Sequence, residues 1–471
     1  MDSGKIYTAL AAVSAVTIYY FYARWTAPDK LKLAVLQASA PNDATKRTYQ
    51  SLIGALPRRV FTPHDGEFLK ALKLYFASQA QHVLPAFIVR PTSMEEVATA
   101  VRIMGKAITA AQPGEVQFAV RSGGHSAIPG AAGVEGGILI DLSLLNSVIV
   151  AKNSKTVDVQ PGVRWKDVYR TLDAHGLSCA GGRACDVGVG GLILGGNNFA
   201  IVTKYTLHTF QQAKLWTGHI YHWPSSTPSL LESYYHFSRP ENYDPCATVI
   251  FAIGYFGLLN LHVPAPSVHY TNPVKNPPAL QWLTKAPHFH STLKIRTMSE
   301  ATHTVNSASA MTGLRWHFTT TTFENNLDMT LSAHAAYRTG SSKVRHVSGV
   351  CFAIVFQPLV PSATKYHDNN SLGIDTDKTL TVVLISVYWK RAIDDEKVYA
   401  ASEETIRTIE SEAKAMGVYH PYKYANYASK GQEVLEGYGA ERVRMLREVA
   451  KKYDPSGVFG KRSMPGGFKL Q

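Results

Sequence analysis

The chain has 471 residues, of which 45% are hydrophobic and 18% are charged. This composition can bury a large core, so it excludes a disordered or fibrous chain, and the length predicts two or three domains. The net charge of +13 is compatible with nucleic acid, an anionic membrane surface or an anionic cofactor as partner. The basic cluster from Arg442 to Lys452 has helical spacing, which is typical of a solvated helix face, so nucleic-acid binding is not predicted.

Cysteine and histidine do not indicate a metal site or a disulfide framework. The four cysteines include no CxxC pair, and the histidines on strand-like segments lack carboxylate partners at ligand spacing. We therefore expect no bound metal.

The N-terminus contains an uncharged segment of eighteen residues, 6–23, whose end is rich in tyrosine and is followed by Trp25. This length is the lower limit for a membrane-spanning helix and long for the core of a signal peptide. The tyrosines resemble the aromatic belt of a membrane interface. We expect residues 1–27 to be a single membrane anchor of a protein of the secretory pathway; the alternatives are a cleaved signal with secretion, and a soluble apolar helix. The sequon at 369–371 would carry a glycan only in a lumenal or secreted protein.

The first half of the chain mixes strand and helix patterns. A polar, partly helical lead-in over 28–60 precedes a predicted strand at 87–91, and a capping box formed by Ser93 and Glu96 predicts that a helix begins there. Strands are predicted next at 116–120 and 137–143, followed by a hairpin over 147–159 with its turn at Asn153-Ser154, and by a short helix with one apolar face. The buried face of this helix is predicted to consist of Trp165, Val168, Tyr169 and Leu172.

The second half is dominated by long strand patterns, which are suited to one large antiparallel sheet. The predicted strands are 215–223, 247–256, 314–323 and 379–389. A helix over 441–453 is predicted to end at Asp454-Pro455, with Val443, Leu446, Val449 and Tyr453 facing inward. The predicted fold class is α+β.

Two glycine-rich segments are the strongest candidates for a ligand site. In the segment RSGGHS, residues 121–126, two glycines allow close backbone approach, and successive N–H groups can form a nest for anionic oxygens beside His125. A tight turn with an incidental histidine would explain the same six residues. The second segment, GGRACDVGVGG at 181–191, does not fit G-x-G-x-x-G because Ile193 occupies the last glycine position, so a nicotinamide-binding Rossmann site is disfavoured.

The order and separation of these segments resemble those of flavoproteins with a PCMH-type FAD-binding domain, in the berberine-bridge-enzyme-like group. The chain is most similar to fungal FAD-linked oxidoreductases of secondary metabolism, over roughly 60–471. The matching segments are 87–91, 121–126, 186–191, 197–203, 424–427, 453–455 and 465–468. The resemblance implies a two-subdomain FAD-binding domain over 61–211, a substrate domain with a large antiparallel sheet backed by helices over 212–420, and a C-terminal module over 421–471 that returns to the FAD domain.

The resemblance also implies a cofactor and its attachment. FAD is expected to be bonded covalently through His125 to the 8α carbon of the flavin. A second covalent bond is not expected, because Ala184 occupies the position of the second attachment and Cys185 is one residue away. The other residues expected to bind the cofactor are Arg121, Ser122, Gly123, Gly124, Ser126, Val187, Gly188, Gly190, Gly191, Ile201, Val202 and Tyr427.

The implied reaction is the oxidation of a CH–OH or CH–N type bond in a small metabolite, with hydride transfer to flavin N5 and reoxidation by dioxygen. Tyr424 and Asn426 match the catalytic motif, where a tyrosine can accept the substrate proton if its pKa is lowered from about 10. An aromatic stripe in the core is the alternative for these tyrosines, and more so for Tyr427. The sequence makes no prediction about the substrate or the oligomeric state.

One departure from the family affects the second subdomain. The segment 186–196 continues directly into Asn197, where relatives have several dozen further residues. We therefore expect a truncated second subdomain with exposed apolar surface and sheet edges. A truncated pseudoenzyme without productive FAD is thus the alternative function.

Overall fold

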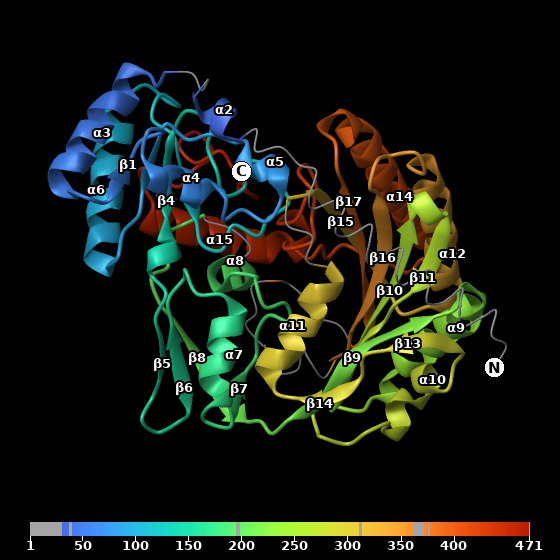
Figure 1. Cartoon of the computed structure of the whole chain (residues 1–471). Helices are drawn as coiled ribbons and strands as arrows, with labels where there is room; N and C mark the ends of the chain where they lie inside the picture. Colours follow the sequence, from blue (N-terminus) through green and yellow to red (C-terminus); the bar gives the residue numbers. More distant parts are fainter. Residues whose placement is uncertain are drawn as a thin grey trace.

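The structure, a computed structural model, describes residues 31–36, 40–194, 198–309, 313–361, 372, 374 and 377–470. The uncharged segment 6–23, the junction at 195–197 and the sequon at 369–371 lie outside the described residues. Two small α/β subdomains and one large sheet make up the described chain (Figure 1).

The first subdomain is a four-stranded sheet in the order β1-β2-β4-β3. Both β2 and β3 pair with β4 in parallel, and the crossover between β2 and β3 is helix α6 (Met94–Ala110). The predicted N-cap is confirmed, because Ser93 Oγ accepts a hydrogen bond from the Glu96 N–H at 3.2 Å. The strands are β1 (Val60–Phe61), β2 (Phe87–Val89), β3 (Phe118–Arg121) and β4 (Ile138–Asp141), and the other helices are α2 (Leu31–Leu36), α3 (Asp43–Ala55), α4 (Gly66–Leu72) and α5 (Ser78–Gln81).

The second subdomain is an antiparallel sheet in the order β5-β6-β8-β7, covered on one face by α7 (Trp165–Asp173). All four residues predicted for the inner face of α7 are buried, and the predicted hairpin turn is present, with Ser154 at φ +55°. Ile149 and Phe210 are 62% and 49% exposed, but the truncation itself stays a prediction because the junction is not described. The elements are β5 (Val148–Val150), β6 (Thr156–Val159), β7 (Leu177–Cys179), β8 (Tyr205–Gln211) and α8 (Val189–Leu194).

The large antiparallel sheet is confirmed, and its described residues form ten strands. Its main path runs β13-β9-β12-β10-β16-β17-β15-β18, with β11 paired to β10 and β14 to β9. The longer strands are β9 (Leu215–His222), β10 (Ala247–Phe256), β15 (Arg315–Glu324), β16 (Cys351–Leu359) and β17 (Leu380–Trp389). The shorter strands are β11 (Leu261–Pro264), β12 (Ser267–Tyr270), β13 (His288–Ser291), β14 (Lys294–Arg296) and β18 (Tyr419–His420).

Four helices cover one face of this sheet, and the main core lies between these helices and the sheet. The covering helices are α9 (Thr227–Phe237), α10 (Gln281–Thr284), α12 (Leu327–Lys343) and α14 (Asp395–Ala415) (Figure 1). Helix α11 (Met298–Ser309) packs instead against α7 of the second subdomain and against β9. The opposite face of the large sheet is therefore left for the two subdomains to cover.

The C-terminal segment contacts both parts of the molecule. Phe459 and Met464 are buried in the core of the first subdomain, and Phe118 N–H donates to Ser463 O at 2.8 Å. The predicted inner face of the last helix, α15 (Ala440–Tyr453), is partly wrong: Val443 is buried, whereas Val449 and Tyr453 are 39% and 65% exposed. Apolar spacing marks a stripe on a helix, but the tertiary contacts decide how much of the stripe is covered.

The prediction of a membrane anchor has to be corrected. Within the ranges that the structure describes, no helix combines the length and the apolar character needed to cross a bilayer. The 21-residue helix α14 has the length, but charged side chains such as Glu403 and Arg407 interrupt it. The predicted transmembrane helix and membrane localisation are therefore contradicted by this finding, and segment 6–23 lies outside the described residues.

Candidate active site

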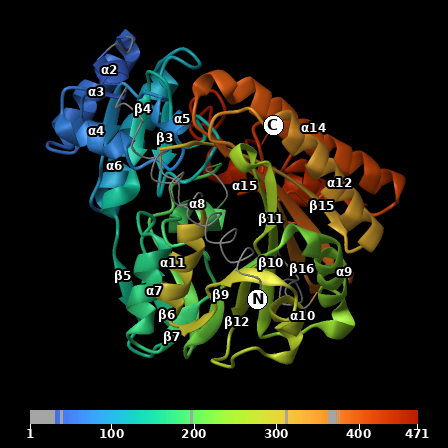
Figure 2. The ribbon, with the colours of Figure 1, turned by 45° about the vertical axis from the view of Figure 1, so that its right-hand side comes forward.

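A cavity of about 980 Å³ lies between the two glycine-rich segments and the uncovered face of the large sheet. Both ribbon views place α8, which carries the end of the second glycine segment, where the two subdomains meet (Figures 1 and 2). Every predicted cofactor-binding or catalytic residue except Arg121 lines this cavity. They are Ser122, Gly123, Gly124, His125, Ser126, Val187, Gly188, Gly190, Gly191, Ile201, Val202, Tyr424, Asn426 and Tyr427.

The two glycine segments touch through their backbones, which explains why glycine is required. A Cβ atom on Gly123 would lie 2.5 Å from the Cα of Gly188, and one on Gly190 would lie 2.8 Å from Ser122 Oγ. Gly124 has a positive φ of +62°, a conformation that other residues rarely adopt. The contact between these loops therefore forms part of the cavity wall. It also fixes the position of His125, which follows Gly124 in the chain.

The donors of the first segment suit an anionic ligand. Within the described residues, the backbone N–H groups of Gly123, Gly124 and His125 have no protein acceptor. A Cβ atom on Gly191 would meet no atom of the described residues within 4 Å, so a ligand can approach that backbone closely. A nest of unpaired N–H groups beside open glycine backbone fits the pyrophosphate and ring of a dinucleotide such as FAD.

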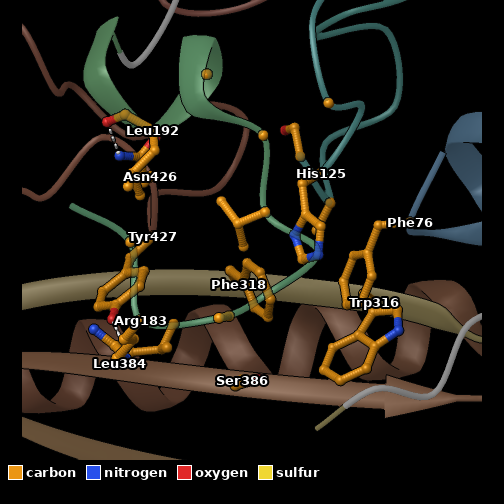
Figure 3. Close-up of a pocket in the computed structure, with 18 of the residues that line it drawn as sticks. Phe76, His125, Arg183, Leu192, Trp316, Phe318, Leu384, Ser386, Asn426 and Tyr427 are labelled. Atoms are coloured by element: carbon orange, nitrogen blue, oxygen red, sulfur yellow. Dashed lines mark hydrogen bonds between the residues drawn. The ribbon is translucent and has the colours of Figure 1, made fainter. Parts of the chain in front are cut away.

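His125 lies at one end of the cavity with its imidazole stacked against an aromatic ring. It stacks on Phe76 with centroids 4.1 Å apart and an interplanar angle of 14°, and Phe76 contacts Trp316 at 4.7 Å (Figure 3). Burial, and secondarily the charge of Arg164, lowers the pKa of His125 to about 4. The imidazole is therefore neutral at physiological pH and keeps a free nitrogen lone pair.

Arg121 is buried away from the cavity. Its guanidinium forms an ion pair with Asp141 at 2.8 Å, donates to Ala71 O at 2.7 Å and lies over the Tyr75 ring at 4.5 Å. Arg90 binds the same carboxylate at 3.1 Å. Arg121 thus holds the start of the glycine segment in place and does not face a ligand.

The C-terminal motif is joined to the second glycine segment. Asn426 Nδ2 donates to Leu192 O at 2.9 Å and to the Tyr424 hydroxyl at 3.1 Å (Figure 3 shows the first bond). Burial raises the pKa of Tyr424, and this outweighs the lowering by Asn426 and by the charge of Arg183. The lowered pKa that a base would need is therefore not produced by the protein around Tyr424.

The sheet face that lines the cavity has small side chains at its centre. Ala353 pairs with Gly254 on one side and Ser386 on the other, and Ser386 pairs with Phe318 across the next strand. These residues alternate with buried ones such as Ile385, which face the covering helices. The row of small side chains makes room for a ligand between the sheet and the glycine segments.

Many side chains at the cavity had no predicted role, and four of them make contacts that matter for the site: Phe76, Arg183, Trp316 and Gln357. Arg183 lies within the glycine segment 181–191, so a basic residue in a predicted ligand loop was the available signal. Trp316 and Gln357 could not be found from sequence, because no local pattern shows which strand face meets the cavity, and Phe76 lies in a loop that carries no motif.

Comparison with known proteins agrees with this geometry. Residues 85–219 match the family model described as FAD binding domain, which overlaps most of the predicted 61–211. The FAD-dependent monooxygenase drtC of Aspergillus calidoustus is 28% identical over 479 residues, covering 88% of this chain and 88% of that protein.

Solved structures share the fold. The 6-hydroxy-D-nicotine oxidase of Arthrobacter nicotinovorans superimposes with a TM-score of 0.68 at 18% identity, over 85% of this chain and 96% of that chain. The BBE-like 1 protein of Physcomitrella patens gives a TM-score of 0.66 at 14% identity, over 88% and 99%.

The FAD-binding domain, the relatives and the cavity define an FAD-dependent oxidoreductase. The matched FAD binding domain, the relatives and the shared fold support the predicted resemblance to berberine-bridge-enzyme-like flavoproteins with a PCMH-type FAD-binding domain.

Proposed function

We propose that the protein oxidises a CH–OH or CH–N type bond of a small metabolite in secondary metabolism. The observation that carries this proposal is the cavity itself, because it brings His125, both glycine segments and the Tyr424–Tyr427 motif to one space against an open sheet face. When bound there, FAD would accept the hydride at N5 and be reoxidised by dioxygen with release of peroxide.

We further propose that His125 attaches the cofactor covalently. Its neutral imidazole lines the cavity beside unpaired backbone donors, and stacking on Phe76 restrains the ring. A single attachment is supported by the second segment, where Ala184 lines the cavity while Cys185 is buried and burial raises its thiol pKa to about 11.

Tyr424 and Asn426 are the proposed catalytic pair. Because its pKa is raised, Tyr424 is a neutral phenol at physiological pH, so it would hold the substrate oxygen or nitrogen by a hydrogen bond. To take the substrate proton as a base it must first ionise, which favours reaction at alkaline pH. Asn426 keeps the phenol in place by binding both its hydroxyl and the carbonyl of Leu192.

The proposal is tested on the purified full-length chain. A flavin absorbance spectrum, loss of that absorbance when a substrate is added without air, and peroxide formation when air is admitted are the expected results. A colourless protein would instead favour the truncated pseudoenzyme; salt-sensitive nucleic-acid binding by such a protein would favour a basic interaction protein.

The name of the Aspergillus relative raises one further candidate, a monooxygenase. In that case an oxygen atom from dioxygen enters the product, and the reaction requires an external reductant. Isotope-labelled dioxygen distinguishes the two reactions, because label appears in the product only for the monooxygenase and in peroxide for the oxidase.

A further inference from the structure

The cavity carries one permanent charge. Among its described lining residues Arg183 is the only arginine or lysine, and aspartate and glutamate do not occur. The lining histidines His125 and His219 are neutral at physiological pH, because burial lowers the pKa of each to about 4. Within the described residues Arg183 has no ion pair with a carboxylate, so its positive charge is not compensated by the protein.

Three distant parts of the chain meet at this guanidinium. Arg183 comes from the second glycine segment, donates from Nη1 to Gln357 Oε1 of β16 at 3.3 Å, and donates from Nη2 to the Tyr427 hydroxyl. Tyr427 in turn donates to Gln357 Oε1 at 3.1 Å. Only these two neutral acceptors are found among the described residues for the five N–H donors of the arginine, so it can still bind an anionic group.

The position of Arg183 points to the substrate and away from the cofactor. Figure 3 shows Arg183 beside Tyr427 and Leu384, with Phe318 between it and His125. Its partner Gln357 belongs to the sheet face, where Gly254, Ala353 and Ser386 leave room for a ligand. The unpaired backbone donors expected to hold FAD lie on the other side, next to His125.

We propose that Arg183 determines substrate specificity by binding an anionic oxygen of the substrate. The walls near the small-residue row are aromatic, from Phe256, Trp316 and Tyr388, so the substrate is a planar, mainly apolar molecule that bears a carboxylate, phenolate or enolate. This inference deepens the proposed function and rests on it, since it takes the cavity to be the site of oxidation.

The test uses isothermal calorimetry on the full-length chain at pH 8 with two matched pairs of probes. Naphthoate and naphthamide have the same shape but differ in charge, and nitrophenolate and nitroanisole make the same comparison for a phenolate. The wild type is expected to bind the anion of at least one pair roughly 10- to 100-fold more tightly than its neutral partner. The pair that shows the preference identifies the kind of acid.

Two variants separate the charge from the shape of Arg183. Arg183→Met is expected to abolish the preference, and Arg183→Lys to keep part of it, because lysine retains the charge without the planar fork. Arg170→Met, on the exposed face of α7 with 73% of its side chain accessible, is the control and should leave the preference unchanged.

Equal wild-type affinity for both members of each pair, or a preference retained in Arg183→Met, would overturn the proposal. Flavin content is measured by absorbance on the same samples. Loss of flavin from Arg183→Met with the anion preference intact would assign this arginine to the cofactor. If the wild type binds no flavin, the proposed oxidation fails, whereas the calorimetric preference still decides whether Arg183 binds an anion.

Discussion

At the scale of single residues, His125 gives the most direct prediction. Replacing it in His125→Ala removes the ring nitrogen that would bond to the flavin, so acid precipitation should leave all flavin in the supernatant. The wild-type pellet should stay yellow. Cys185→Ser is the control and should leave attachment unchanged, since the Cys185 thiol is buried outside the cavity lining. Wild-type flavin that is fully extractable by acid would exclude a covalent bond.

Tyr424 makes a second prediction at this scale. Tyr424→Phe keeps the ring but removes the hydroxyl that Asn426 binds, so turnover should fall by roughly 10²- to 10⁴-fold, the usual contribution of a general acid or base. Because its pKa is raised above 10.0, the wild-type rate should still be increasing with pH at pH 9–10. A profile that reaches its plateau near neutral pH would show that another group accepts the proton.

At the scale of elements, glycine variants in the second glycine segment test folding and cofactor binding separately. Gly188→Ala would place a Cβ 2.5 Å from the Cα of Gly123, so we expect the flavin-free protein to lose about 1–3 kcal/mol or more of its free energy of unfolding. The Cβ of Gly191→Ala meets no atom of the described residues within 4 Å, so this variant should keep that stability while its flavin content falls, because Gly191 lines the cavity. Urea unfolding and flavin absorbance measure the two effects; equal stability loss in both variants would contradict the assignment.

At the scale of the whole molecule, buried histidines predict acid sensitivity. Burial lowers the pKa of six of the described histidines to about 4 and that of His269 to about 3. Between pH 6.5 and 4 the unfolded chain therefore binds more protons than the folded chain, and stability falls as pH falls through this window. If two of these histidines behave in this way, the free energy of unfolding drops by about 2.7 kcal/mol per pH unit.

His317 offers a matched test of this effect. Its buried Nε2 has no hydrogen-bond partner among the described residues. His317→Phe should therefore reduce the change of the free energy of unfolding with pH by up to the contribution of one proton, about 1.4 kcal/mol per pH unit. The exposed His236, replaced in the same way, should not change the slope. Urea unfolding at pH 7 and 5.5 measures both, and identical slopes in the two variants would show that His317 is not among the groups responsible.

The junction at 195–196 concerns the whole molecule as well. If residues of the second subdomain are missing there, the chain should load flavin weakly, and inserting the corresponding segment of a close relative should raise flavin content and turnover together. Misplacement of reacting atoms by about 1 Å can cost roughly a hundredfold in rate. Full flavin content and rapid peroxide formation by the 471-residue chain itself would show that the short junction is functional.

Local sequence motifs, through the family resemblance that they carry, predicted the FAD cofactor and a group of residues that lie together at the cavity. Gly123 and Gly188 can be recognised because close backbone contact excludes every larger side chain, and this constraint appears in the sequence as an unusual density of glycine. The helix that begins after Ser93 and the strands of the large sheet could also be predicted, because a capping residue and an alternating apolar pattern are local signals.

Only the tertiary structure decided where side chains point. Arg121 lies in the glycine segment, yet its guanidinium forms an ion pair with Asp141 on a neighbouring strand. Arg183 donates hydrogen bonds to Gln357 and Tyr427, which are 174 and 244 residues away in the sequence. The exposed end of α15 has the same origin, because a periodic apolar stripe does not tell how far a partner covers it. Contacts between distant segments depend on the packing of the whole chain, so no local pattern encodes them, and in this protein they set the charge and shape of the cavity.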